Sequence, residues 1–74
     1  VLSANLENTG RSFREQDNVV DAVVAASRST DSGVRNACSF TLGVLGGEKS
    51  VESLFRLMGD PASDVRSNAA LGLA

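Results

Sequence analysis

Apolar residues recur along the chain with a period of 31 residues. The run Val20–Val24 aligns with Val51–Phe55 one period later, and Val34–Arg35 aligns in the same register with Val65–Arg66. This register continues without a gap for more than twenty positions. A fixed period of this length is typical of proteins that stack copies of one supersecondary unit. The sequence therefore predicts a repeat protein.

Within one period, the apolar positions between Ser32 and Gly46 have helical spacing. They recur every three or four residues, as the apolar face of an amphipathic helix requires. Ser32 is a suitable N-cap, and Gly46 followed by Gly47 is a suitable helix end. The apolar positions are Val34, Ala37, Cys38, Thr41, Leu42 and Leu45.

A second helix is predicted directly after this one, and it ends at the sequence Gly59–Asp60–Pro61. Each period is therefore a pair of helices. The apolar face of the second helix comprises Val51, Leu54, Phe55, Leu57 and Met58.

The same template extends to both ends of the chain. It predicts a first helix, a loop over 14–18, a partner helix, and a further first-type helix over 63–74. We therefore expect an all-α protein of five helices, with repeat one over about 1–31, repeat two over about 32–62 and a half repeat over 63–74. The spacing of Leu2, Leu6, Thr9 and Phe13 predicts the first helix, and that of Val19, Val20, Val23, Val24 and Ser27 predicts its partner.

Composition limits how such a chain can be stabilised and what chemistry it can perform. A single cysteine cannot form an internal disulfide, and without histidine the common structural zinc sites are excluded. A chain of 74 residues buries only a small core, so support from neighbouring chain or a partner subunit is expected. Ser–His and Cys–His catalysis is also absent from these residues. We expect a non-catalytic protein without a cofactor or a metal.

The charge balance bears on partners and location. A net charge of −2 and a pI near 4.8 do not favour a surface that collects phosphates, so no nucleic-acid partner is expected. The longest uncharged stretch, from Asn36 to Gly47, is too short and too polar to cross a bilayer. We therefore expect a soluble, cytoplasmic protein.

Two segments resemble HEAT repeats, namely Val34–Gly46 and Asp60–Ala70. In particular they are similar to the short repeats of bilin-lyase-like and other bacterial and archaeal HEAT proteins. The resemblance implies a right-handed α-solenoid, in which the first helix of each pair lines the convex side and the second lines the concave side.

The resemblance also implies a ladder between successive repeats, in which an Asp at the turn pairs with an Arg on the next helix. Asp60 and Arg66 have the matching separation of six residues. In the earlier repeat Arg35 is kept but Ser29 replaces the aspartate, and Asp31 is an alternative partner. A structural role is expected for Asp31, Arg35, Asp60 and Arg66.

Solenoids usually bind partners on the concave side. Helical spacing turns Val20, Val23, Val24, Leu54, Phe55 and Met58 inward, and leaves six residues on that side: Asp21, Ala25, Arg28, Glu52, Ser53 and Arg56. Asp21 and Glu52 occupy equivalent positions and could form an acidic strip that meets basic residues of a peptide. The alternative is a solvated face on which Glu52 and Arg56 form an ordinary (i, i+4) ion pair.

Other residues with suggestive chemistry have structural explanations. Cys38 lies on an apolar face, where a small buried residue is expected. Gly43, Gly46 and Gly47 lack the Lys–Ser/Thr ending and preceding strand of a phosphate loop, so a helix C-cap is expected. Asp64 near a helix start is explained by the helix dipole.

Three functions follow, in decreasing order of support. The first is a protein-binding or scaffolding module; the second is part of an enzyme or a lyase-type chaperone subunit such as a bilin lyase; the third is a nucleic-acid-binding surface. The chain starts at Val1, so we expect a fragment of a longer solenoid. Its apolar end is predicted to drive self-association, and comprises Ala69, Ala70, Leu71, Leu73 and Ala74.

Overall fold

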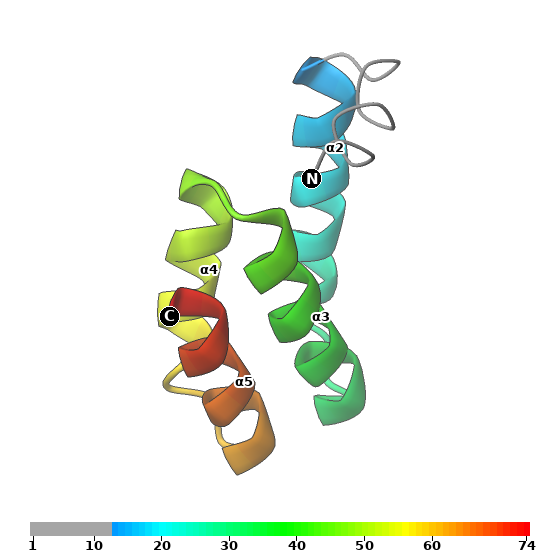
Figure 1. The fold of residues 1–74 in the computed structure, drawn as a ribbon. Helices are drawn as coiled ribbons and strands as arrows, with labels where there is room; N and C mark the ends of the chain where they lie inside the picture. Colours follow the sequence, from blue (N-terminus) through cyan, green and yellow to red (C-terminus); the bar gives the residue numbers. More distant parts are fainter. Residues whose placement is uncertain (1–12) are drawn as a thin grey trace.

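The computed structural model describes residues 13–74, which form four helices joined by short loops (Figure 1). These are α2 (Phe13–Ala26), α3 (Ser32–Leu45), α4 (Glu48–Leu57) and α5 (Ser63–Leu73). The helix predicted through Leu2, Leu6 and Thr9 lies outside the described residues, so the expectation of five helices is not supported.

The loop predicted over 14–18 is wrong, because α2 runs through it without interruption. These five residues contain no glycine or proline, and Arg, Glu and Gln are good helix formers. The apolar periodicity starts only at Val19, so the sequence pattern does not distinguish the polar first turns of α2 from a loop.

Local chemistry sets the two ends of α3. The N-cap is Asp31 rather than the predicted Ser32: its backbone is extended, and its carboxylate accepts a hydrogen bond from the Gly33 N–H at 2.7 Å. The predicted stop at Gly46 and Gly47 is confirmed, with φ of 67° and 89° respectively. Only glycine adopts such backbone angles without steric cost, so α3 ends there and α4 begins directly afterwards.

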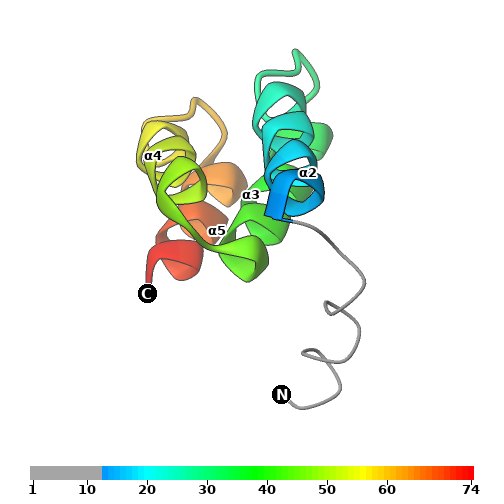
Figure 2. The same cartoon turned by 90° about the horizontal axis from the view of Figure 1, so that it is seen from above.

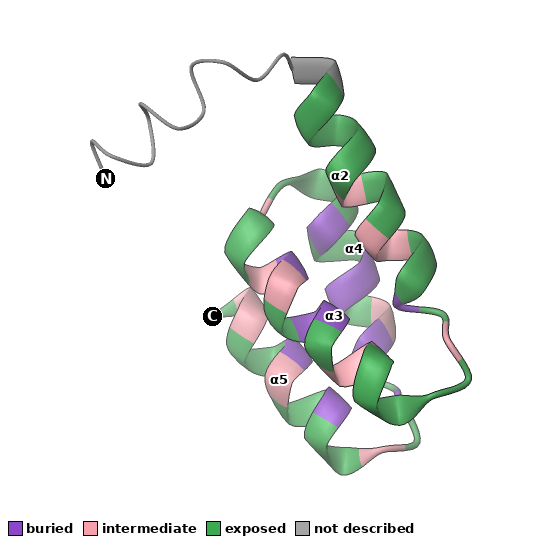
Figure 3. Ribbon diagram, turned by 90° about the vertical axis from the view of Figure 1, so that its right-hand side faces the viewer, coloured by how far each residue is buried: buried purple, intermediate pink, exposed green. Residues whose placement is uncertain are grey.

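The helices alternate in direction and form two layers (Figures 1 and 2). Helices α2 and α4 lie side by side in one layer, and α3 and α5 form the other. The core lies between the layers and is drawn in purple in Figure 3. It comprises Leu42, Leu54, Leu57, Val65 and Ala69, against which Val23, Val24, Ala62 and Leu73 pack.

Two glycines bring α3 and α5 into close contact. A Cβ atom built on Gly43 would lie 2.8 Å from the Cα atom of Gly72, closer than real atoms approach. Next to this crossing, the Asn68 side-chain amide donates to Asn36 Oδ1 at 2.5 Å. Gly43 therefore serves a helix crossing and not the C-cap that was expected.

The predicted apolar faces are buried only in part. Leu42, Leu54 and Leu57 are fully covered, as the spacing predicts. By contrast, Phe55 is 64% exposed and Met58 is 42% exposed, so their predicted inward orientation is wrong. The core side of α4 follows Ser50, Ser53, Leu54 and Leu57, which leaves Phe55 on the outer side. None of the helices in residues 13–74 has the length and apolar character needed to cross a bilayer.

Candidate protein-binding groove

A groove of about 230 Å³ lies between α2 and α4. Four of the six residues predicted for the binding surface line it, namely Arg28, Glu52, Ser53 and Arg56. Val24 and Lys49 complete the lining of this α2–α4 groove. Asp21 and Ala25 are exposed on α2 but are not part of the lining.

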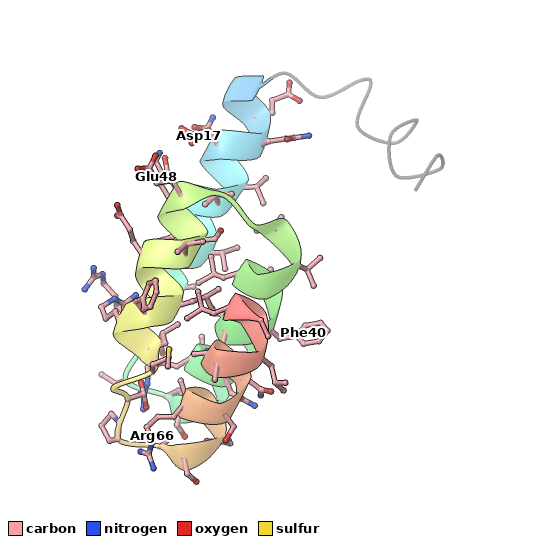
Figure 4. All side chains as sticks on the ribbon, turned by 60° about the vertical axis from the view of Figure 1, so that its left-hand side comes forward. Asp17, Phe40, Glu48 and Arg66 are labelled. Carbon is pink, nitrogen blue, oxygen red and sulfur yellow. The ribbon has the colours of Figure 1, made fainter. Side chains whose placement is uncertain are left out.

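Of the two acids expected to form an acidic strip, Asp21 is engaged by a lysine of α4, whereas Glu52 forms no ion pair among the described residues. Lys49 Nζ donates to Asp21 Oδ1 at 2.9 Å and to Asp17 Oδ1 at 3.0 Å, so the two aspartates share one cation. Figure 4 shows Asp17 beside the start of α4, where Lys49 lies. These hydrogen bonds, first with Asp21 and then with Asp17, raise the pKa of Lys49. Sequence spacing missed Lys49, which lies one helical turn before the aligned acid Glu52.

Arg56 does not form the (i, i+4) ion pair with Glu52 that was considered. Its Nη2 atom donates to Ser27 Oγ at 2.6 Å, and Ser27 Oγ in turn donates to the Val24 carbonyl at 2.6 Å. Ser27 is completely buried, so it holds the guanidinium against α2. Partial burial, followed by the positive charge of Arg28, lowers the pKa of Arg56. The groove is therefore more basic than the sequence suggested.

Ser53 contributes little to the exposed surface of this groove, because it is only 6% exposed. It belongs to the small polar side of α4 that packs toward the other helices, together with Ser50. Ser50 is completely buried, and its Oγ has no hydrogen-bond partner among the described residues. Small side chains on α4 thus allow close packing at the cost of an unsatisfied hydroxyl.

The four residues expected to link repeats are brought together at the loops, with partners different from those expected. Arg35 forms a bidentate ion pair with Asp60, with Nε–Oδ2 at 2.7 Å and Nη2–Oδ1 at 3.1 Å. Arg35 Nη1 also donates to the carbonyls of Ser29 and Thr30. The Asp31 carboxylate caps α3 and forms no ion pair with the Arg35 guanidinium; the two residues are joined only through the backbone, where the Asp31 carbonyl accepts the Arg35 N–H at 3.1 Å.

Arg66 repeats the backbone contacts of Arg35 in the next loop. Its Nη1 donates to the Asp60 carbonyl at 2.7 Å and to the Pro61 carbonyl at 3.0 Å. Arg66 therefore bonds to the main chain of Asp60, whereas Arg35 of the preceding helix pair takes the Asp60 carboxylate. Figure 4 places Arg66 at this loop end of the molecule.

The environment of Asp60 favours its ionised form. The hydrogen bond from Arg35, followed by that from the Ala62 N–H at 2.9 Å, lowers the pKa of the Asp60 carboxyl. The same ion pair raises the pKa of Arg35. The bridge thus joins α3 to the α4–α5 loop, and each partner stabilises the charged form of the other.

Two apolar surfaces lie away from the α2–α4 groove. A cavity of about 510 Å³ opens between α2 and α3, with Ala22, Val34 and Cys38 in its lining. Burial raises the pKa of the Cys38 thiol, so the reactive thiolate is disfavoured. A second hollow of about 380 Å³ lies between α3 and α5, beside Phe40 and Leu71. Figure 4 shows Phe40 projecting outward from α3.

Residues 13–74 contain no group of three acidic, cysteine or histidine side chains that could hold a metal ion. The described residues form helix pairs, with an Arg–Asp bridge between successive pairs and a groove along the α2–α4 layer. These features define an α-helical repeat protein of the solenoid class.

The chain belongs to the HEAT repeat family: the family model for HEAT repeats matches residues 6–74. The resemblance deduced from the sequence is confirmed at this level, and the narrower similarity to bilin-lyase-like repeats stays a prediction. No curated protein and no solved structure shows significant similarity to the chain.

Proposed function

We propose that this chain is a non-catalytic protein-binding or scaffolding module that takes its partner along the α2–α4 layer. HEAT repeats typically bind proteins. The observation that carries the proposal is the α2–α4 groove, in which Arg28 and Arg56 converge without a carboxylate partner among the described residues. The buried Cys38 and the absence of histidine support a role without catalysis.

The proposal is tested by quantitative affinity capture from an extract of the source organism. We expect a specific protein to be retained by the wild-type chain and lost with Arg28→Glu, which reverses an exposed charge in the groove. The matched control is Phe40→Ser, on the α3–α5 layer, which should retain the same protein. Retention that is equal for all three chains would place the binding surface elsewhere, and the absence of any specific protein would contradict the function.

A second proposal is self-association, favoured by a specific apolar patch. Phe40, Val44 and Leu71 are 67%, 72% and 71% exposed, and all three line the hollow between α3 and α5. Of the terminal residues expected to be uncovered, Ala69 is buried and Leu73 is half-buried, while Ala70, Leu71 and Ala74 are exposed. The exposed apolar surface thus supports association through the side of α5 together with α3.

A further inference from the structure

We infer that the α2–α4 groove binds an acidic segment of the partner protein, with a carboxylate placed between Arg28 and Arg56. This inference rests on the proposed protein-binding function and names the chemistry of the partner. It differs from both alternatives drawn from the sequence, an acidic strip that meets basic residues of a peptide and a solvated helix face.

The first argument is the distribution of ion pairs around the groove. Near the groove, the carboxylates of Asp17 and Asp21 bind Lys49, and that of Asp60 binds Arg35. The two arginines of the groove have no ion pair within residues 15–74. Two guanidinium groups thus line one concavity without an ion pair, and Glu52 in the same lining balances at most one of their charges, so an added anion would relieve their repulsion.

The second argument is that Arg56 is held in place before any partner binds. Ser27 accepts its Nη2–H at 2.6 Å, and Ser27 is itself fixed by the Val24 carbonyl. One nitrogen of the guanidinium is therefore engaged, and its other N–H groups remain for a carboxylate. A side chain that is already ordered loses less conformational entropy when it binds a ligand. Burial, followed by the positive charge of Arg28, lowers the pKa of Arg56, and the opposing effect of the Asp60 charge is smaller.

The third argument concerns size and selectivity. A groove of about 230 Å³ accommodates a side chain and a short stretch of backbone, not a whole helix. Glu52 lies in the same lining and adds a negative charge beside the two arginines. This carboxylate disfavours a long, densely charged polyanion such as RNA more than it disfavours a short acidic segment. The overall charge of −2 disfavours nucleic acid further.

The test uses the full chain and nuclear magnetic resonance of the arginine Nε–H groups. The probe is hexaglutamate, acetylated and amidated, and the uncharged control is hexaglutamine. We expect hexaglutamate to shift the Arg28 and Arg56 signals saturably and to leave those of Arg35 and Arg66 in place. Arg28→Gln should weaken binding by roughly threefold to tenfold, the range for a partly exposed charge-assisted pair.

Arg28→Gln is the decisive variant because the Arg28 side chain is exposed and its removal should not affect folding. Arg66→Gln removes the same charge outside the groove and should bind as the wild type does, with circular dichroism verifying its helical content. Equal weakening by both variants would show non-specific attraction and overturn the inference.

Two further outcomes separate this inference from the proposed function. Loss of the captured protein with Arg28→Glu, together with no shift on adding hexaglutamate, would keep the protein-binding function and overturn the acidic partner. Tighter binding of a single-stranded oligonucleotide of equal charge at Arg28 and Arg56 would also overturn it, in favour of a phosphate ligand.

Discussion

Arg35 on α3 and Asp60 in the α4–α5 loop, 25 residues apart, form a bidentate ion pair at 2.7 and 3.1 Å. Both side chains are largely buried, with 16% and 7% of their surface exposed. The planar guanidinium matches the two carboxylate oxygens, a geometry that lysine cannot reproduce. The pair therefore joins α3, the first helix of one helix pair, to the loop that leads from this pair into α5.

Asp60→Asn should lower the thermal unfolding temperature of the chain. Asparagine keeps an oxygen for the Ala62 N–H but loses the charge that binds Arg35, so the arginine is left without its counter-ion. The loss should exceed that of Asp21→Asn, whose side chain is half-exposed beside Lys49. Calorimetry of Asp60→Asn and Asp21→Asn measures the two unfolding temperatures and tests this order. In Arg35→Gln, the additional effect of Asp60→Asn should be much smaller.

The stability of the chain should fall on acidification below pH 4, in part through Asp60. The pKa of this carboxyl in the folded chain lies below its ordinary value of 3.8. Its contribution to stability is therefore present above that value and is lost as the pH falls through the folded pKa. Urea unfolding from pH 7 to pH 2.5 should show the difference between wild type and Asp60→Asn shrinking below pH 4. A difference that stays constant would contradict the role of this charge.

Gly43→Ala should destabilise the chain by roughly 1–3 kcal/mol, the usual cost of overpacking. Alanine is the better helix former by about 1 kcal/mol, but its Cβ would lie 2.8 Å from Gly72 Cα and force α3 away from α5. Gly59→Ala is the matched control, because its Cβ would be 3.6 Å from the nearest atom, the Arg56 carbonyl oxygen. Urea unfolding measures both, and equal stability of the two variants would show that the crossing can relax.

Ser50→Ala should stabilise the chain by about 0.5–2 kcal/mol, since it removes a buried hydroxyl that lacks a partner among the described residues. The matched control is Ser39→Ala. Ser39 is equally buried, but its Oγ donates to the Arg35 carbonyl at 3.0 Å. Its replacement should leave stability unchanged or lower it slightly. If the two alanine variants behave alike in urea unfolding, the hydrogen bond is not what distinguishes these serines.

Light scattering across a dilution series should show a mass above that of the monomer at high concentration. Leu71→Ser should reduce this association, because it removes an exposed apolar side chain from the hollow between α3 and α5. Phe55→Ser removes a side chain of similar exposure on α4 and serves as the control. A wild-type chain that stays monomeric and helical at every concentration would rule out self-association through this patch.

The sequence alone was enough to establish the helix-pair repeat, because the information for it is local. Burial of Leu42, Leu54 and Leu57 follows from three- and four-residue spacing. The end of α3 follows from Gly46, which adopts a positive φ that other residues avoid. The family match over residues 6–74 agrees with this pattern.

Tertiary packing decided which members of each apolar face are covered. Leu54 is buried whereas its neighbour Phe55 is exposed, since the helices packed against α4 cover the side that carries Ser50, Ser53 and Leu57. The periodicity of apolar residues indicates an apolar face about 100° wide on a helix. The helices packed on either side then determine which residues of that face are covered. The inward orientation predicted for Phe55 failed for this reason.

Charge partners were likewise decided by the packing of helices and not by separation along the chain. Asp60 is six residues from Arg66, but its carboxylate faces Arg35, since the stacking of α3 beside α5 places that guanidinium at the loop. Lys49 likewise binds Asp21 across the α2–α4 contact. Local sequence thus determined the helices and their ends, whereas side-chain partners 25 to 32 residues apart were determined by the packing of helices against each other.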